Sequence, residues 1–308
     1  MKVRHTTVGC GVVRRGAGRG ALAALLTAVA CGLLAACGVP ASTSGTSQLR
    51  LAPVKAAVAE LPASIRTSGV LVTAMALTAP PGSYFPMGSQ TLAGLDPSIA
   101  HLLADALGLK LQMQNVSFDA IIPGMAAGRY PITISEMSPE PVREKVLDFV
   151  DYAQTGDALA VPVGNPNHIN ISNLCGLTVG ALAGGYQITQ VLPAVNKRCI
   201  EDRKPAIQFK LYPDESTPIL ALSSSRIDAV YEDSTVLDYA AARDPDIEVQ
   251  VNRNYGPVAV GIAKSTGLLP AIQTAMSAII KSPQYHALLN NLGLASVTIT
   301  DAKLNDNG

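Results

Sequence analysis

One short stretch of small residues has the position and the chemistry of an anion-binding turn. Gly180, Gly184 and Gly185 lie between a predicted strand and a predicted helix. Backbone N–H groups at the N-terminus of a helix can bind a carboxylate or a phosphate. The alternative is a tight turn that simply needs small residues, and the glycine spacing does not match the dinucleotide-binding pattern.

Motifs of catalysis and of metal binding are missing from the sequence. It contains no HExxH, GxSxG or GxxxxGK[ST] pattern. The four histidines are scattered along the chain, and none stands at a ligand spacing from a cysteine: His5, His101, His168 and His286. We therefore expect no catalytic residues, no metal and no cofactor, and a protein that is not an enzyme.

The N-terminus has the pattern of an export signal. Five basic residues and no acidic one precede residue 20, and an apolar run over 21–36 follows. These sixteen residues are fewer than the roughly 20 that span a bilayer, which favours a secretory signal. Leu34-Ala35-Ala36-Cys37 resembles a bacterial lipobox, in which the cysteine is lipidated after cleavage before it. An ordinary signal peptide and an uncleaved anchor are the alternatives.

The segment after the signal is small and polar. Residues 38–48 are rich in Gly, Ser and Thr, which is typical of a flexible tether. We therefore expect a signal peptide over 1–36, followed by lipidated Cys37 and a tether over 37–66. The folded part would stand outside the cell, lipid-anchored to the membrane, because no other apolar run approaches 18 residues.

The cysteines fit an oxidising compartment. Cys10 and Cys31 leave with the signal and Cys37 takes the lipid, so Cys175 and Cys199 remain. An even pair in an exported protein favours a disulfide over two buried thiols.

The composition excludes several other classes. Of 308 residues, 15% are charged and 48% hydrophobic, so most of the chain is not disordered. Lys+Arg and Asp+Glu are both 23, and removing the five basic residues of the signal leaves 18 against 23. Without Trp and with only 4% aromatic residues, the sequence offers neither a basic surface nor a stacking surface for nucleic acid.

Short apolar strands alternate with amphipathic helices from residue 68 onward, which indicates an α/β fold. Strands are expected at 70–76, 111–116, 130–137, 158–163, 177–182, 207–211, 227–231, 247–251 and 258–263. Helices are expected from Asp96-Pro97 to Leu107, from a Ser117 cap to Gly128, and over 141–147, 186–196, 218–225, 234–242, 268–280 and 284–292.

Several short motifs follow one another in an order that resembles that of a known family. They are LAGLD (92–96), LGLK (107–110), SFDAIIPG (117–124), GRY (128–130), REKVLDFV (143–150) and SRIDAVYED (225–233). From Gly69 to about Leu294, their order is similar to the extracytoplasmic solute-binding proteins of polar amino-acid ABC transporters, bacterial solute-binding family 3. Leu174-Cys175-Gly176 with Cys199 resembles the disulfide-bearing second lobe of Gram-positive relatives.

The resemblance implies a two-lobe, periplasmic-binding-protein-like (type II) fold with two hinge strands. We expect lobe 1 over 67–160 plus 258–308, lobe 2 over 161–257, and hinges near Leu159–Pro162 and Gly256–Val260. The family implies a monomer that clamps a small molecule between its lobes and delivers it to an ABC permease in the membrane.

An α-amino acid can be buried only if its carboxylate and its ammonium each find a partner. The resemblance implies that Arg143, whose planar fork suits a carboxylate, binds one end. Asp233 would bind the ammonium from the other lobe. Alternatively, Arg143 lies on a solvated face beside Glu144 and Lys145, and Asp233 only caps the following helix.

Further pocket residues follow from the same resemblance. Ser138 would offer its hydroxyl and N–H, Gly185 or Tyr186 would donate backbone N–H groups, and Ser135 and Glu136 complete the set. Other candidate residues have simpler explanations. Asp96 and Asp228 are more simply structural, and Tyr84 and Phe85 either wall the pocket or pack beneath a loop.

The sequence departs from the family at several positions. Relatives usually carry Asp at Pro131, Gly or Ser at Glu136, Thr at Glu140 and Gly185, and an aromatic residue at Gly82. Glu136 would bring a second anion close to Arg143, where it points outward, neutralises the arginine or meets a cationic group of the ligand. We therefore expect a neutral or cationic amino acid or a related amine-bearing molecule rather than glutamate.

Two other functions share this scaffold. A ligand sensor would dock onto a membrane receptor instead of a permease. A dehydratase similar to the cyclohexadienyl dehydratases would use a pocket carboxylate such as Glu136 as a general acid or base. Fold alone does not separate these functions.

Overall fold

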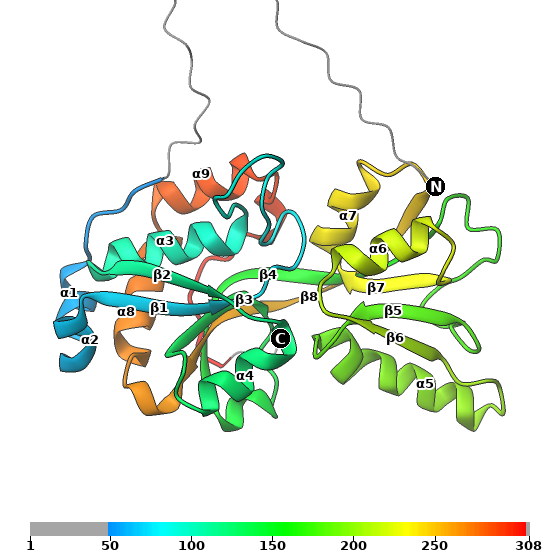
Figure 1. Ribbon diagram of the computed structural model, residues 1–308, viewed down its shortest axis with the longest axis horizontal. Coiled ribbons are helices and arrows are strands. Elements are labelled where there is room, and N and C mark those ends of the chain that lie inside the picture. Colours follow the sequence, from blue (N-terminus) through cyan, green and yellow to red (C-terminus); the bar gives the residue numbers. More distant parts are fainter. Residues whose placement is uncertain (1–48, 306–308) are drawn as a thin grey trace, which may run out of the picture. The chain divides into compact units, whose positions relative to one another are not determined.

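The computed structural model describes residues 49–305, and the predicted signal, Cys37 and the tether up to residue 48 lie outside this range. The described chain is an α/β fold around eight strands in the order β2-β1-β3-β8-β4-β7-β5-β6 (Figure 1). The strands are β1 (Val70–Met75), β2 (Lys110–Asn115), β3 (Ile132–Met137), β4 (Leu147–Pro162), β5 (Thr178–Leu182), β6 (Gln208–Tyr212), β7 (Ala229–Asp233) and β8 (Ile247–Ala263).

Helices cover both faces of each half of the sheet (Figure 1). They are α1 (Lys55–Ala59), α2 (Ala63–Ser68), α3 (Leu95–Leu107), α4 (Phe118–Ala126), α5 (Leu192–Glu201), α6 (Ser216–Ser223), α7 (Ser234–Ala241), α8 (Leu269–Ile280) and α9 (Pro283–Asn291). Short 3₁₀ turns lie at η1 (Arg143–Lys145), η3 (Lys264–Thr266) and η4 (Ala295–Val297), and a π turn, η2 (Gln187–Val191), precedes α5.

The eight strands form two half-sheets that share β4 and β8. In the first lobe, β2, β1 and β3 lie beside the C-terminal half of β8 and the N-terminal half of β4. In the second lobe, β7, β5 and β6 lie beside the other halves of the same two strands. The expected two-lobe α/β fold with two connecting strands is therefore confirmed.

Each lobe has a core on either side of its half-sheet. In the first lobe, α3, α8 and α9 cover one face and α4 the other. In the second lobe, α6 and α7 cover one face and α5 the other. Apolar side chains on these faces, such as Leu103 of α3 and Ile272 of α8, are fully buried.

β4 and β8 are longer than their apolar patterns predict. β4 begins at Leu147, where a short helix was expected to end, and the strands expected at 247–251 and 258–263 form the single strand β8. The polar stretch of β4 and Pro257 interrupt the apolar runs. The two strands nevertheless pair with each other along their length, which holds them extended.

The passage between the lobes lies near Gly156. Pairing of β4 with β7 begins at Asp157, and the register between β4 and β8 shifts between Gly156 and Asp157. In β4 the pairing therefore passes to the second lobe slightly before the expected hinge at Leu159–Pro162, and Asp157–Ala160 pair with β7. The partner of Gly156 on β8 is Tyr255, beside the expected hinge at Gly256–Val260.

Three helices differ from what the sequence pattern predicts. α1 and most of α2 fall within the stretch 37–66 in which a tether was expected, because Ala57 and Leu61 bury themselves in the core of the first lobe. Ser117 occupies the N-cap position of α4, but its side chain makes no capping hydrogen bond.

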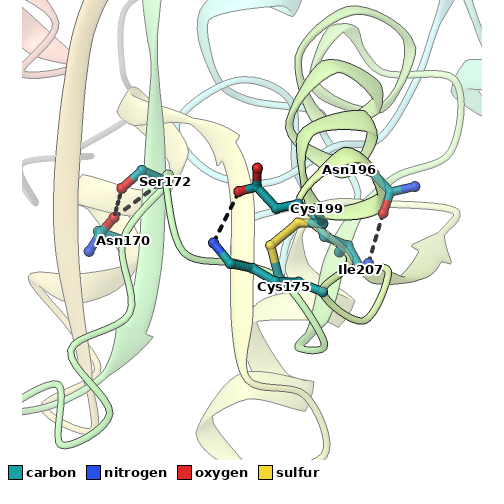
Figure 2. The surroundings of a disulfide bond; sticks show 8 residues. Asn170, Ser172, Cys175, Asn196, Cys199 and Ile207 are labelled. Atoms are coloured by element: carbon teal, nitrogen blue, oxygen red, sulfur yellow. Dashed lines mark hydrogen bonds and ion pairs between the residues drawn. A yellow bond between two sulfur atoms is a disulfide. The ribbon is translucent and has the colours of Figure 1, made fainter.

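The predicted disulfide is present. Cys175, before β5, is bonded to Cys199 in α5, and their Cα atoms are 5.5 Å apart (Figure 2). A hydrogen bond close to the disulfide joins α5 to the start of β6: the Ile207 N–H donates to the Asn196 side chain over 2.8 Å. The alternative of two buried thiols is therefore wrong.

Replacing both cysteines by serine is expected to lower the free energy of unfolding by about 3 kcal/mol. The bond joins residues 24 positions apart, and opening a loop of this size returns about 3–4 kcal/mol of chain entropy to the unfolded state. Urea unfolding of the double variant measures the change. A loss below about 1 kcal/mol would contradict the prediction.

Neither a transmembrane helix nor a metal cluster is found in residues 49–305. No helix there is long and apolar enough to cross a bilayer. The same range holds no group of three or more His, Cys, Asp or Glu side chains suited to a metal ion.

Candidate functional site

A small cavity lies between the lobes, and all seven residues expected at the ligand line it. The volume of the cavity is about 20 Å³, which leaves room for little more than one water molecule. An amino acid would therefore enter only if the lobes moved apart. The cavity is lined by Thr78, Phe118, Ser135, Glu136, Ser138, Arg143, Leu182, Gly185, Tyr186, Gln187, Glu215 and Asp233.

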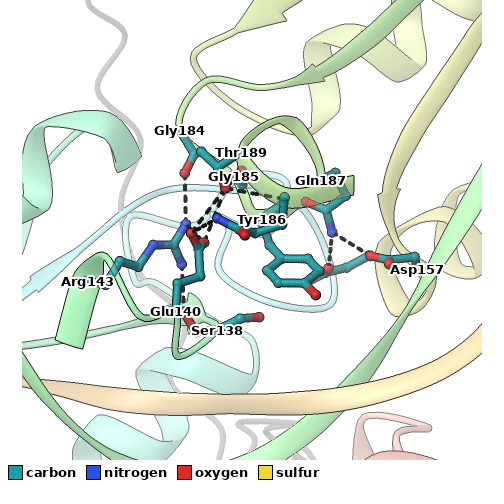
Figure 3. A network of polar contacts seen from close by, with 11 residues as sticks. Ser138, Glu140, Arg143, Asp157, Gly184, Gly185, Tyr186, Gln187 and Thr189 are labelled. Carbon is teal, nitrogen blue, oxygen red and sulfur yellow. Dashed lines mark hydrogen bonds and ion pairs between the residues drawn. The ribbon is translucent and has the colours of Figure 1, made fainter. Parts of the chain in front are cut away.

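Arg143 is buried at this cavity rather than solvated. Its side chain is 5% exposed, and its guanidinium lies 5.6 Å from the centre of the Phe118 ring. Nη1 donates to the Ser138 carbonyl over 2.8 Å, and Nη2 donates to the Gly184 carbonyl over 2.9 Å (Figure 3). Arg143 therefore joins η1 of the first lobe to the turn after β5 of the second.

The acid beside Arg143 is Glu140, not Glu136. Glu140 Oε1 lies 2.6 Å from Arg143 Nη2, and the Glu140 side chain is only 1% exposed. Across the cleft, Gln190 Nε2 donates to Glu140 over 2.7 Å, and the Thr189 hydroxyl lies 3.3 Å from each carboxylate oxygen (Figure 3). Of the three alternatives for Glu136, neutralisation of the arginine is therefore not seen, because Glu140, three residues before Arg143, forms that ion pair.

Asp233 faces the cavity instead of capping α7. It occupies the N-cap position, but its side chain makes no capping hydrogen bond. Asp157 of β4 stands opposite it in the sheet, and the Gln187 amide donates to both carboxylates, over 2.7 Å to Asp233 and 3.1 Å to Asp157. One neutral donor therefore separates two acids that would otherwise repel each other.

Glu136 is held in an unusual backbone conformation. Its φ is +47°, in the left-handed region that residues with a side chain rarely adopt. Its N–H donates to the Tyr152 hydroxyl, which in turn donates to Asp96. The carboxylate fills the place that a side chain at Gly82 would need, and its Oε2 has no hydrogen-bond partner in the structure. The two departures from the family, at 82 and 136, are thus coupled in space.

Replacing Glu136 by glycine is expected to stabilise the protein by about 1–3 kcal/mol. The change removes a strained left-handed backbone and a buried carboxyl atom without a partner. Arg203→Gly is the matched control, because Arg203 also has a positive φ of +57° but is exposed. Urea unfolding should show a larger gain for Glu136→Gly than for the control, and an equal or smaller gain would contradict this account.

Several polar groups of the remaining predicted residues already have partners within the protein. The Ser135 hydroxyl accepts from the Ala76 N–H and donates to the Ile134 carbonyl. The Gly185 N–H, expected to bind a ligand carboxylate, donates to the Leu182 carbonyl. Ser138 contributes its carbonyl to Arg143. In the expected anion-binding turn, the Gly185 N–H is therefore taken by a carbonyl of the protein itself.

Several acidic or amide residues at the site are not marked as site residues by the sequence. Glu215 and Gln187 line the cavity, and Asp157 lies behind Gln187. The sequence marks Glu140 only as a departure from the family pattern. Nothing in the spacing of Glu215 marks it, since it comes to the cavity from the start of α6 in the second lobe.

The other candidates serve the fold. Asp228 accepts from the Thr178 N–H over 2.7 Å, and Asp96 is buried against Tyr152. Both agree with the structural role expected for them. Tyr84 and Phe85 line a separate, open hollow and not this cavity.

The site contains more acids than cations. Burial raises the pKa of Asp96 and of Asp233 from 3.8 to about 7. The pKa of Glu136 and that of Glu215 lie well above their ordinary value, first because of burial and then because of neighbouring carboxylates. Glu232, just before Asp233 on β7, is raised for the same reasons. Burial lowers the pKa of Arg143, and Glu140 opposes this shift.

Stability is therefore expected to fall as the pH rises from about 4 to about 7. In this window the folded protein keeps protons on Asp96 and Asp233 that the unfolded chain has lost, so folding is favoured at the acidic end. Melting temperatures at pH 5.5 and pH 8 measure the effect, and the value at pH 5.5 should be higher. A higher value at pH 8 would contradict it.

The fold and the interlobe cavity define a two-lobe solute-binding protein, and comparison with known sequences agrees. Residues 71–293 match the sequence model of the bacterial extracellular solute-binding proteins, family 3. The chain belongs to this family.

Relatives with assigned ligands are similar over most of the chain. The arginine-binding protein ArgT of Corynebacterium glutamicum is 25% identical over 85% of this chain and 86% of its own length. The L-cystine-binding protein TcyA of Bacillus subtilis is 25% identical over 71% and 75%. These relatives are binding proteins, not enzymes.

Solved structures share the fold. An ancestral arginine-binding protein bound to arginine superposes with a TM-score of 0.66 and 25% identity over 73% of this chain and 98% of its own. The ancestral amino acid-binding protein AncCDT-1, described as a precursor of cyclohexadienyl dehydratase, has a TM-score of 0.63 and 23% identity over 74% and 97%. The second similarity concerns the fold alone.

Proposed function

We propose that the protein is the substrate-binding component of an ABC importer and that it captures a small solute with a cationic amino or guanidino group. Membership of the family and arginine-binding relatives support this role. The observation that carries the cationic preference is the cavity itself. Glu136, Glu215 and Asp233 line it, while Arg143, the cationic residue among the described ones that line it, is already paired with Glu140.

Both lobes contribute to binding in this proposal. Glu136 belongs to β3 of the first lobe, and Glu215 and Asp233 belong to the second. A cation between them is fully surrounded only when the cleft is shut. The ligand therefore favours the closed state by its differential affinity for it, and bending near Gly156 would open the cleft.

The surroundings of the protein are part of the proposal. A lipid on Cys37 would hold the mature chain on the outer face of the membrane, where it meets the permease. The lipobox-like sequence before Cys37 and the disulfide, which suits an oxidising compartment, support this location.

We further propose that the protein binds its ligand without converting it. The relatives with assigned roles bind amino acids, and the fold it shares with a dehydratase precursor carries no activity by itself. Incubation of the purified protein with prephenate or arogenate tests the alternative, and product formation would contradict the proposal. Loss of solute uptake in a strain lacking the protein would separate an importer from a receptor-coupled sensor.

Calorimetry of the purified protein against arginine, lysine, ornithine, glutamine, glutamate and small diamines tests the binding function. At least one cationic compound is expected to bind in the micromolar range or tighter, and glutamate is expected not to bind. Tight binding of glutamate alone, or of none of the panel, would overturn the proposed ligand class.

A further inference from the structure

Arg143 already has a carboxylate, and that carboxylate belongs to the protein. Nη2 contacts Glu140 Oε1 at 2.6 Å and the Gly184 carbonyl at 2.9 Å, while Nη1 donates to the Ser138 carbonyl at 2.8 Å. Both N–H bonds of Nη2 are thus directed at protein oxygens. A ligand carboxylate could therefore bind Nη2 only by displacing Glu140 or the Gly184 carbonyl.

Glu140 is fixed in this position from the opposite lobe. Gln190 Nε2 donates to Oε2 over 2.7 Å, and the Thr189 hydroxyl lies within 3.3 Å of both oxygens. The side chain is 1% exposed. A buried carboxylate that lost the guanidinium and these contacts would be left without compensation, which is strongly unfavourable. The Arg143–Glu140 ion pair is therefore a fixed part of the site.

The rest of the cavity is lined by carboxyl groups, and a cation bound among them would favour their charged form. Oε2 of Glu136 is buried and has no hydrogen-bond partner in the structure, and the Glu215 carboxyl is buried beside the Thr78 side chain. Both side chains line the cavity, together with Asp233. With Arg143 neutralised by Glu140, a carboxylate on the ligand would face three acidic side chains and, among the described residues that line the cavity, no other cation. Ammonium or guanidinium groups would instead supply the missing donors.

We infer that the cleft is specific for a small dication without a carboxylate, an alkyl diamine or an aminoalkyl guanidine, and that Glu140 replaces the ligand carboxylate at Arg143. This inference rests on the proposed function and narrows its substrate class. It makes Glu140 a specificity-determining residue: its carboxylate excludes amino acids by occupying the position at which their own carboxylate would bind.

A matched pair of ligands tests the inference on the purified protein. Agmatine differs from arginine only by lacking the α-carboxyl group, and putrescine differs from ornithine in the same way. Calorimetry should show agmatine or putrescine binding at least tenfold tighter than its carboxylate-bearing counterpart. Equal or tighter binding of arginine and ornithine would overturn the inference while leaving the proposed function in place. Binding of neither type would count against both.

Glu140→Thr tests the role of the side chain. It frees the fork of Arg143 and is expected to move the ratio of the two affinities at least tenfold toward arginine. Glu140→Gln keeps the size of the side chain but removes its charge, and it should move the ratio in the same direction if the threonine variant does not fold. Lys145→Met, on the exposed side of the same turn, should leave the ratio unchanged. An unchanged ratio in the Glu140 variants would overturn the inference.

Discussion

Replacing Arg143 by methionine is expected to lower the free energy of unfolding by about 3–5 kcal/mol, because it leaves a buried acid without its partner. Arg143 and Glu140 are 5% and 1% exposed and lie 2.6 Å apart. Methionine fills part of the volume of the arginine side chain, so the loss reflects mainly the uncompensated charge. Urea unfolding of the variant and of the original protein measures it.

Two further variants isolate the charge effect. Lys145→Met alters an exposed residue of the same turn and should change stability by less than about 0.5 kcal/mol. The double variant Arg143→Met with Glu140→Gln removes both charges and should regain much of the loss. If Arg143→Met is as stable as Lys145→Met, Arg143 is solvated, as its charged neighbours in the sequence would suggest.

Replacing Asp233 by asparagine is expected to weaken binding of the cationic ligand at least thirtyfold. Removing one partner of a buried charge pair costs about 2–5 kcal/mol of binding free energy. Asparagine keeps the size of the side chain and an oxygen that accepts from Gln187. Stability should not fall, because one of several crowded carboxylates loses its charge. Calorimetry with the tightest ligand of the panel measures the affinity.

Asp228→Asn is the control for this prediction. Asp228 lies five residues earlier, away from the cavity, and accepts a hydrogen bond from the Thr178 N–H that asparagine can also accept. Its affinity for the ligand should stay within about twofold of the original, since surface-side changes remote from a site have small effects. If Asp233→Asn and Asp228→Asn bind the ligand alike, Asp233 is not a ligand residue.

Arg143 and Asp233 have other partners in the structure than the sequence pattern predicts. The pattern of the family predicts a guanidinium and an acid that bind opposite ends of a dipolar ligand. The structure brings both to the cavity but supplies Arg143 with Glu140 and Asp233 with Gln187. Both charged groups therefore already have a partner within the protein.

Local periodicity was enough to predict most elements of the fold. The alternation of apolar strands and amphipathic helices depends on neighbours three or four residues apart, and it gave β1, β5, α3 and α8 within a few residues of their bounds. It failed for β4 and β8, because their polar segments are held extended by pairing with each other and not by burial. It also missed α1, whose Ala57 is buried in the core formed with α3 and α8, and α2, which follows it.

The sequence by itself determined the two-lobe α/β fold, the disulfide between Cys175 and Cys199, and seven of the twelve residues that line the cavity. These features follow from local patterns and from motif order, which a linear chain displays directly. Only the tertiary structure decided which charges meet. Glu140, Gln187 and Glu215 come from separate segments, and their partners lie across the cleft or on another element. Electrostatic energies depend on distance and burial in space, and neither is written in the order of the residues.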